Sequence, residues 1–291
     1  MDNIYILFSK LLYSELSKVF KCLENFNYVV IKGEPLSKLA YGNFNKRKST
    51  DIDFLIDKKD IAIVSSILNE NGFFQKEISR NGKIISNMFS HQFTPFVKKT
   101  PIANLTVDVN YDLFWGEYEG ERIDITEFIN DSFFMDIFGN LVKTLTPEKA
   151  LIQLVLHHYK EMNSLYHLAT HNSINLIMFE EIYNLIINSA ITPERVYCLS
   201  KKYNILPYMY YMLYYTAEAL ENNDLEKHIS LCKAGCDPNL INNYGLSRNE
   251  IKSWKYDFKT RLNAENMYTL IESDLTIKDK NKIEINRKVF G

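Results

Sequence analysis

Two aspartates, Asp51 and Asp53, alternate with apolar residues in the stretch 51–57 of the chain. Successive side chains on a β-strand point to opposite faces, so a strand here places both carboxylates on one face and Ile52 and Phe54 on the other. Two like charges at this spacing repel each other unless a cation or a proton neutralises them. Because Mg²⁺ accepts carboxylate oxygens readily, the pair predicts a divalent-cation site.

A third carboxylate lies on a second alternating segment. Residues 105–111 alternate between apolar and polar side chains, and Asp108 lies on the polar face. If this strand lies beside the strand of Asp51 and Asp53, the three carboxylates meet at one place on the sheet. Such a set can hold two divalent ions, which clamp the attacking and leaving oxygens of a phosphoryl transfer. That reaction depends more on positioning and charge stabilisation than on covalent help from the protein.

A segment suited to phosphate binding precedes the aspartates. Residues 28–31 form a β-branched run typical of a buried strand, and Lys32-Gly33 follows it directly. Gly33 has no side chain, so a phosphate can approach its backbone N–H. The helix predicted for residues 35–41 starts just after it and points its N-terminus towards that anion.

A basic loop follows, and each piece of this pattern also has an ordinary structural explanation. Lys46, Arg47 and Lys48 lie just before the aspartates, where Arg47 suits bidentate contact with a triphosphate. Such a run is more often a solvated loop, an isolated Asp-x-Asp is common, and Lys-Gly after a strand is usually a turn. The order of the pieces favours a site: strand, Lys-Gly, helix, basic loop, Asp-x-Asp strand, and a third aspartate on an alternating strand.

This stretch resembles the polymerase β-type nucleotidyltransferase superfamily, and most of all its branch of uncharacterised bacterial nucleotidyltransferases. Members of that branch show a Lys-Gly motif, a leucine and a tyrosine in the next helix, an arginine, an Asp-x-Asp strand, a Val-Asp strand, and a later histidine after a leucine-rich turn. The matching residues here are Lys32-Gly33, Leu36, Tyr41, Arg47, Asp51-Ile52-Asp53, Val107-Asp108 and Leu154-Val155-Leu156-His157-His158. The resemblance covers residues 28–190.

The resemblance implies an α+β fold, with a polymerase β-like mixed sheet and flanking helices followed by an all-helical C-terminal domain. It implies that Asp51 and Asp53 act in catalysis by binding two metal ions, Mg²⁺ or Mn²⁺. It also implies that Asp108 completes one of the two metal sites near the acceptor hydroxyl.

The same resemblance assigns the triphosphate contacts to Gly33 and Arg47, with Lys32 and Ser49 as further candidates. The wider superfamily favours Gly-Ser after the first strand, where the serine hydroxyl binds a phosphate. Here the pair is Gly33-Glu34, which removes that hydroxyl and adds a negative charge.

Apolar spacing and turn residues divide the chain into an α/β domain (1–145), a helical domain (146–265) and a polar tail (266–291). In the first domain we expect helices at 3–25 and 58–71. We expect β-strands at 73–78, 83–89 and 92–98, with a hairpin turn at Asn81-Gly82, and a second hairpin formed by 133–138 and 141–145 about Gly139-Asn140.

The helical domain begins at a recognisable start signal. Thr146-Pro147-Glu148 offers an N-cap, a proline at the first helical position and an acid in the first turn, and Thr192-Pro193-Glu194 repeats it. Helices are predicted at 147–163, 172–190, 193–203, 207–221, 224–234 and 247–262, with no competing strand. The tail has few large apolar residues, so it is predicted to be loosely attached.

Composition limits the classes of function. The net charge of −2 argues against a general DNA-coating or RNA-coating surface. No apolar run approaches the roughly 20 residues that span a bilayer, and the first 16 residues are predicted to form an amphipathic helix rather than a secretory signal. The four cysteines have no zinc-site spacing and fit reduced thiols, so a cytoplasmic location is expected.

The histidines do not have the spacing of a metal site. His157, His167 and His171 form no triad at metal-binding spacing. His158 is in helical phase with Leu154, so it is predicted to point inward, as a core or interface histidine in preference to a substrate contact.

The leading hypothesis is a metal-dependent nucleotidyltransferase that moves a nucleoside monophosphate from an NTP, with ATP favoured, to an acceptor and releases pyrophosphate. The acceptor is a small molecule, a peptide or protein side chain, or an RNA end. The alternative is an inactive nucleotide-binding or partner-binding module on the same fold, of a toxin–antitoxin kind. A metal-dependent phosphohydrolase is a third hypothesis, although this chain lacks the histidine-rich ligand set that such sites often use.

Overall fold

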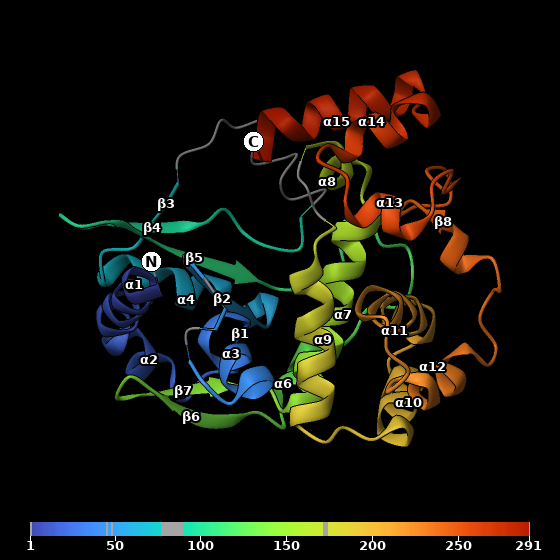
Figure 1. The fold of residues 1–291 in the computed structure, drawn as a ribbon. Helices are drawn as coiled ribbons and strands as arrows, with labels where there is room; N and C mark the ends of the chain where they lie inside the picture. The colour runs from blue at the N-terminus through green and yellow to red at the C-terminus, as the bar shows by residue number, and fades with distance from the viewer. Residues whose placement is uncertain (1, 45, 48, 77–89, 171–173, 291) are drawn as a thin grey trace. The chain divides into compact units, whose positions relative to one another are not determined.

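The computed structural model describes residues 2–44, 46–47, 49–76, 90–170 and 174–290 (Figure 1). The chain divides into two compact units. The sheet unit comprises Met1–Gly116 and Arg122–Ala150, and the helical unit comprises Glu117–Glu121 and Leu151–Gly291.

The described residues of the sheet unit form a mixed sheet, as predicted, with seven strands. The strands are β1 (Tyr28–Ile31), β2 (Asp51–Ile56), β3 (Phe74–Gln75), β4 (Phe96–Lys99), β5 (Asn104–Asn110), β6 (Phe133–Ile137) and β7 (Asn140–Thr144), in the order β3-β4-β5-β2-β1-β7-β6. Strand β2 lies between β1, to which it is antiparallel, and β5, to which it is parallel. The two aspartate-bearing strands are therefore direct neighbours.

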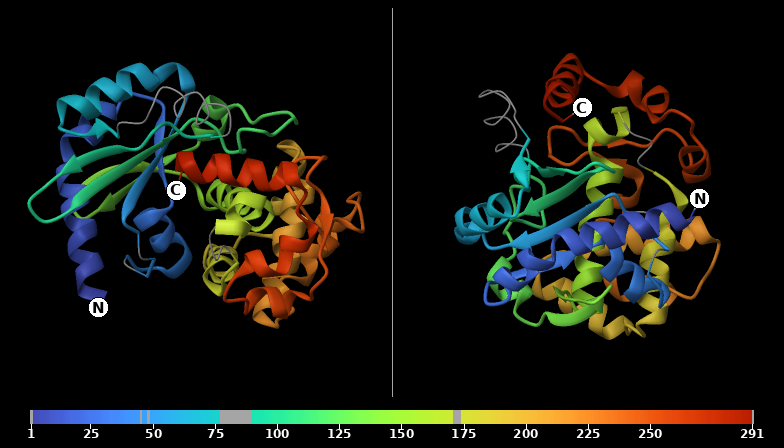
Figure 2. Two further views of the ribbon diagram at one scale, coloured as in Figure 1. Left: turned by 90° about the horizontal axis from the view of Figure 1, so that it is seen from above. Right: turned by 90° about the vertical axis from the view of Figure 1, so that its left-hand side faces the viewer.

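One face of the central strands is buried in an apolar core. Helices α1 (Asp2–Glu15), α2 (Ser17–Leu23) and α4 (Ile61–Glu70) supply apolar side chains to the core, and α1 and α2 run along one side of the sheet in Figure 2. The strands contribute Val30, Phe54 and Val107, none of them more than 1% exposed. Because strand residues alternate, burial of this face leaves the opposite face of β2 and β5 to their polar residues.

Among the residues of the sheet unit that the structure describes, the other helical segments are α3 (Gly33–Tyr41), η1 (Lys58–Asp60) and α6 (Ile125–Ile129). The predicted helix at 3–25 is divided at Leu16, and the predicted helix at 58–71 begins with the short η1 turn before α4. The predicted second hairpin is confirmed, because β6 pairs with β7, but its turn lies one residue earlier than the predicted Gly139-Asn140, since Ile137 lies opposite Asn140. The two loop residues are Phe138 and Gly139, both with positive φ, as a tight type I′ hairpin turn requires.

The helical unit follows the predicted pattern as far as residue 233. Its helices are α7 (Pro147–Asn163), whose first residues belong to the sheet unit, α8 (Leu165–Thr170), α9 (Leu176–Asn188), α10 (Pro193–Lys202), α11 (Leu206–Leu220) and α12 (Glu226–Lys233). The start signal at Thr192 acts as predicted, because its side chain accepts a hydrogen bond from the backbone N–H of Arg195 at 3.3 Å. Helix α8 was not predicted.

The predicted helix at 247–262 is wrong, and the C-terminal region is mainly but not entirely helical. Strand β8 (Asn243–Tyr244) pairs with β9 (Lys252–Ser253), and only α13 (Phe258–Leu262) is helical in this stretch. Gly245 has a φ of +117°, and a Cβ there would lie 2.5 Å from the carbonyl oxygen of Glu250. This close approach lets the chain turn back between the two strands.

The predicted loose polar tail is also wrong. Residues 267–271 form α14 (Met267–Ile271), and after η3 (Glu272–Asp274) the chain forms α15 (Ile277–Phe290), which packs against α8. Met267, Ile271 and Ile283 are buried, so a few apolar residues are enough to attach the segment.

Some predicted elements lie outside the described residues, namely the strand at 83–89, the Asn81-Gly82 turn, and Lys48 of the basic loop. In the part of the chain that the structure describes, no helix has both the length and the apolarity needed to cross a membrane.

Candidate functional site

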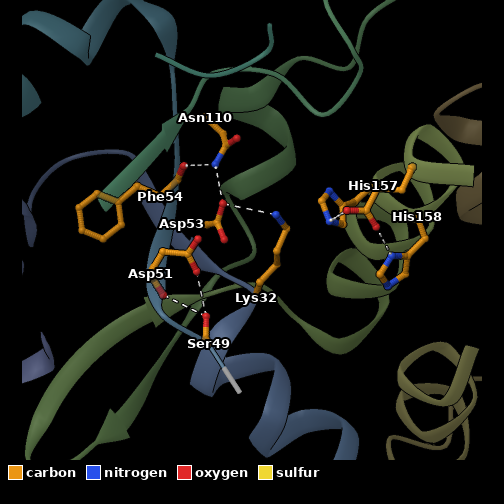
Figure 3. A network of polar contacts seen from close by, with 9 residues as sticks. Lys32, Ser49, Asp51, Asp53, Phe54, Asn110, His157 and His158 are labelled. Atoms are coloured by element: carbon orange, nitrogen blue, oxygen red, sulfur yellow. Dashed lines mark hydrogen bonds and ion pairs between the residues drawn. The ribbon is translucent and has the colours of Figure 1, made fainter. Parts of the chain in front are cut away.

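The parallel pairing of β2 with β5 brings the three predicted aspartates together. Asp53 is the register partner of Asp108, and Asp51 is the partner of Thr106. Register partners on neighbouring strands point to the same face, so Asp51, Asp53 and Asp108 share the polar face of the sheet. Figure 3 shows Asp51 and Asp53 side by side on this face.

Asp53 is held by two donors. The Lys32 ammonium lies 3.3 Å from Asp53 Oδ1, and the Asn110 amide donates to the same oxygen at 3.2 Å (Figure 3). Asn110 also donates to the carbonyl oxygen of Phe54 at 3.1 Å, which fixes the amide against β2. Because Asp53 is only 6% exposed and Asn110 only 2%, water has little access to loosen this arrangement.

Asp51 is held from the loop that precedes it. The hydroxyl of the buried Ser49 lies 3.0 Å from Asp51 Oδ1 and 3.1 Å from the Asp51 carbonyl oxygen. Ser49, predicted as a phosphate contact, is thus a partner of Asp51 in this structure. Its contact with a triphosphate stays a prediction.

The crowding of the carboxylates changes their acidity. Burial, and then the charges of Asp53 and Asp51, raise the pKa of Asp108 to about 7 against the opposing charge of Lys32. Burial and the charge of Asp53 likewise raise the pKa of Asp51, although the hydrogen bond from Ser49 opposes them. The raised pKa values of Asp51 and Asp108 mean that burial and mutual repulsion disfavour their ionised forms, and that the nearby charge of Lys32 opposes this only in part.

One buried carboxylate oxygen on this face has no hydrogen-bond donor among the described residues, which bears on whether a metal ion fits here. Asp108 Oδ1 is buried, and no donor of the described residues forms a hydrogen bond with it. A buried acceptor without a partner costs roughly 1–3 kcal/mol. Asp51, Asp53 and Asp108 offer only carboxylate oxygens, the donors that Mg²⁺ and Mn²⁺ prefer, so the chemistry of these residues fits a divalent cation. In this structure one oxygen from each of the three does not lie within 4.8 Å of the other two, so the side chains must move closer to share an ion.

The Lys32-Gly33 segment has an unusual backbone. Lys32 has φ 60° and ψ −156°, and Gly33 has φ +53°. Lys32 is the N-cap of α3 and makes no side-chain cap hydrogen bond, and the helix starts at Gly33, two residues before the predicted position. This sharp turn brings Lys32 back from the end of β1 towards Asp53.

The basic loop is attached to α3 by a residue that sequence reasoning missed. The buried hydroxyl of Ser37 accepts hydrogen bonds from the backbone N–H groups of Lys46 (3.0 Å) and Arg47 (3.3 Å), and donates to the carbonyl oxygen of Asn43 at 2.9 Å. The charge of Arg47 acts on Asp51, the smallest of the effects on that pKa, which places the loop near the carboxylates.

Glu34, the departure from the superfamily's Gly-Ser pair, is 2% exposed. Burial and then the charge of Glu34 raise the pKa of Tyr13 on α1. The Glu34 carboxylate therefore lies near an α1 residue in the interior of the sheet unit and is not a solvent-facing charge.

The structure thus assembles Lys32, Ser49 and the three aspartates, and adds Asn110, which the sequence analysis did not select. Asn110 lies two residues after Asp108 on the same strand face, and that spacing is the sequence signal that could have identified it.

A mixed seven-stranded sheet with three carboxylates on two neighbouring strands is an α+β arrangement consistent with a nucleotidyltransferase fold. The model of the uncharacterised nucleotidyltransferase family matches residues 6–221, more than half of the 291 residues. The chain therefore belongs to this family, as its motifs predicted, and the match supports nucleotidyl transfer as its general reaction. A search of curated proteins gave no match.

Proposed function

We propose that the protein transfers a nucleoside monophosphate from an NTP, with ATP the first donor to test, to an acceptor hydroxyl. In this reaction the acceptor oxygen bonds to the α-phosphorus, the bond from the α-phosphorus to the bridging oxygen of the β-phosphate breaks, pyrophosphate leaves, and the acceptor loses its proton. The observation that carries the proposal is the buried, unpaired Asp108 Oδ1 in register with Asp53. A cluster of carboxylates with an uncompensated oxygen has little use without a cation.

Asp51, Asp53 and Asp108 would hold the cation, Mg²⁺ or Mn²⁺, with two ions expected. The bound ions would supply charge stabilisation to the attacking and leaving oxygens of the transfer. The chain's own residues orient these carboxylates: Ser49 donates a hydrogen bond to Asp51 and Asn110 donates one to Asp53.

The triphosphate would be held by Gly33 and Arg47. Gly33 begins α3, so its backbone N–H is among the N-terminal helix N–H groups without a partner inside the helix. Ser37 fixes the backbone of Arg47, whose guanidinium suits a phosphate oxygen pair. Lys32 adds a positive charge on the side of Asp53.

Transfer of label from α-labelled NTPs tests the proposal. The protein is incubated with each NTP, Mg²⁺ or Mn²⁺ and a cell extract that supplies the acceptor. We expect a labelled product with the wild type and with Asp60→Asn, a control acid outside the carboxylate face. Asp51→Asn and Asp53→Asn keep the shape of the side chain but remove its charge, so they should lower the rate at least 100-fold.

An inactive nucleotide-binding module is the competing function, because Lys32 already places a protein cation on Asp53. In such a module no label is transferred, and the affinity for NTP does not change when divalent ions are added or chelated. That pair of results would replace the transferase with the binding module.

A further inference from the structure

A second group of potential metal ligands lies in the helical unit, on α7. Glu161 follows His157 by four residues and His158 by three, so one helix brings the three side chains together. His157 Nε2 lies 3.2 Å from Glu161 Oε1, and His158 Nδ1 lies 3.1 Å from Glu161 Oε2. Figure 3 shows the two imidazole rings, whose centroids are 5.3 Å apart.

The spacing of the donor atoms suits a small transition-metal ion. One donor atom from each of the three residues lies within 4.8 Å of the others. In a tetrahedral zinc site, with Zn–N and Zn–O bonds of about 2.0–2.2 Å, neighbouring ligand atoms are about 3.3–3.5 Å apart. The two nitrogen–oxygen distances, 3.2 and 3.1 Å, end on different oxygens of Glu161. With one donor atom per residue the separations reach up to 4.8 Å, so the side chains must move closer together to bind one ion.

A buried carboxylate lies within hydrogen-bonding distance of the second ring nitrogen of His158. His158 Nε2 lies 3.3 Å from Glu181 Oε2, and Glu181, on α9, is only 2% exposed. A metal-binding histidine nearly always donates its second ring N–H to a carboxylate or a carbonyl, which sets the tautomer and orients the ring. With Glu181 on Nε2, the ring directs Nδ1 towards Glu161 and His157.

We propose that His157, His158 and Glu161 bind a Zn²⁺ ion, with Glu181 as the positioning residue for His158. Two imidazoles and a carboxylate are a donor set that suits Zn²⁺ better than Mg²⁺, so this site differs in metal preference from the carboxylate face of the sheet unit. The side chains of His157 and Glu161 are 18% and 27% exposed, which gives the ion access from solvent. Three protein ligands leave one coordination position for water or another small ligand.

The competing account is an ion-pair network, in which protonated imidazoles hold the two glutamates without any metal. The two accounts separate in a direct binding measurement, because protons and Zn²⁺ compete for the same nitrogen atoms. The full chain is used, in an Asp51→Asn/Asp53→Asn background that weakens metal binding at the carboxylate face. Zn²⁺ alone is titrated by calorimetry at pH 7.5.

We expect one Zn²⁺ site in the background protein whose affinity falls at least tenfold in His157→Ala and in Glu161→Gln. Glu181→Gln should weaken binding 10- to 100-fold, as loss of a supporting carboxylate does elsewhere. The matched control is His91→Ala, which removes one imidazole from the sheet unit and should leave the affinity unchanged. Substituted Co²⁺ should show the intense visible bands of a four-coordinate ion in the background protein and not in His157→Ala.

The proposal is overturned if Zn²⁺ binds the background protein and His157→Ala equally, or does not bind the background protein at all. Circular dichroism without metal verifies that each variant is folded. If His157→Ala does not fold, Glu161→Gln decides the question, because it keeps the volume of the side chain. The readout does not depend on nucleotidyl transfer, so it stands whether or not the proposed function is correct.

Discussion

Lys32 combines a strained backbone with a functional contact. Its φ of 60° and ψ of −156° fall in a region used almost only by glycine, which costs on the order of 1–3 kcal/mol for another residue. The same residue pairs with Asp53 at 3.3 Å. A glycine would remove the strain but also the ammonium group, so the sequence retains a costly residue where a positive charge meets the carboxylates.

The first prediction separates the strain from the charge. Lys32→Gly and Lys32→Ala both remove the ion pair, but only glycine accepts this backbone freely, so we expect Lys32→Gly to be about 1 kcal/mol more stable than Lys32→Ala in urea unfolding. The matched control is Lys38 on α3, where the backbone is helical and the order should reverse, with glycine about 0.5–1 kcal/mol less stable than alanine. Equal stability of the two Lys32 variants would mean that the backbone is not strained there.

At the scale of elements, a hydrogen-bonded acid connects the end of β2 with two helical segments. Asp57 Oδ1 accepts from the backbone N–H of Lys59 at 3.0 Å and caps η1, while Oδ2 accepts from the Thr126 hydroxyl of α6. The hydrogen bonds from Lys59, followed by that from Thr126, lower the pKa of Asp57 to about 2. These hydrogen bonds fix the position of the C-terminal end of β2.

The second prediction follows from the sign of that shift. A folded pKa of about 2, below an unfolded value near 3.9, means that the ionised acid stabilises the fold above pH 4 and that this contribution is lost as the pH falls towards 2. Because the Lys59 side chain is 62% exposed and screened, we expect about 1 kcal/mol from Asp57 at pH 7.

Urea unfolding at pH 7 and pH 3 measures the effect. Asp57→Asn should be about 1 kcal/mol less stable than the wild type at pH 7, and roughly half of that difference should be lost by pH 3. Asp60→Asn, in the same turn, is the control for the removal of an acid. A difference between wild type and Asp57→Asn that is the same at both pH values would contradict the prediction.

The strength of the local signal decided which elements could be predicted. Strands β2 and β5 alternate over six and seven residues, so their polar faces, and with them Asp51, Asp53 and Asp108, could be read directly. Their parallel register could not, because it pairs residues more than fifty positions apart. Strands β8 and β9 have two residues each, too few to show a period, and a helix was predicted over one of them.

The supporting residues of the site were harder to predict than the aspartates. Ser37 looks like an ordinary helix residue, and its role depends on the backbone of a loop that folds back onto α3. The strained backbone at Lys32 could not be predicted either, because the ion pair that accompanies it is formed with Asp53 on the neighbouring strand. Sequence patterns therefore identify the charged groups, whereas the tertiary fold determines what holds them.

At the scale of the molecule, the two compact units each have a core and each contain one of the two tryptophans. Trp115 belongs to the sheet unit and is 4% exposed, and Trp254 belongs to the helical unit, where it stacks on Tyr244 with ring centroids 4.1 Å apart. Units with separate cores are expected to unfold separately unless a large interface couples them. Each tryptophan can therefore report the unfolding of its own unit.

The third prediction uses this placement. In Trp254→Phe, fluorescence follows the sheet unit through Trp115, and in Trp115→Phe it follows the helical unit through Trp254. Phe54→Ala, in the core of the sheet unit, should destabilise that unit by about 3–5 kcal/mol and move only the Trp115 transition to lower urea. Phe179→Ala, equally buried on α9, should move only the Trp254 transition.

The two alanine variants serve as controls for each other, because each deletes a fully buried phenylalanine from one core only. If both variants shift both transitions by the same amount, the chain unfolds as one cooperative body and the division into two units has no thermodynamic meaning. If the transitions separate, metal-dependent NTP binding should be lost together with the Trp115 transition in both variants, because the carboxylate face lies wholly within the sheet unit. If metal-dependent NTP binding is instead lost together with the Trp254 transition, essential groups of the site belong to the helical unit.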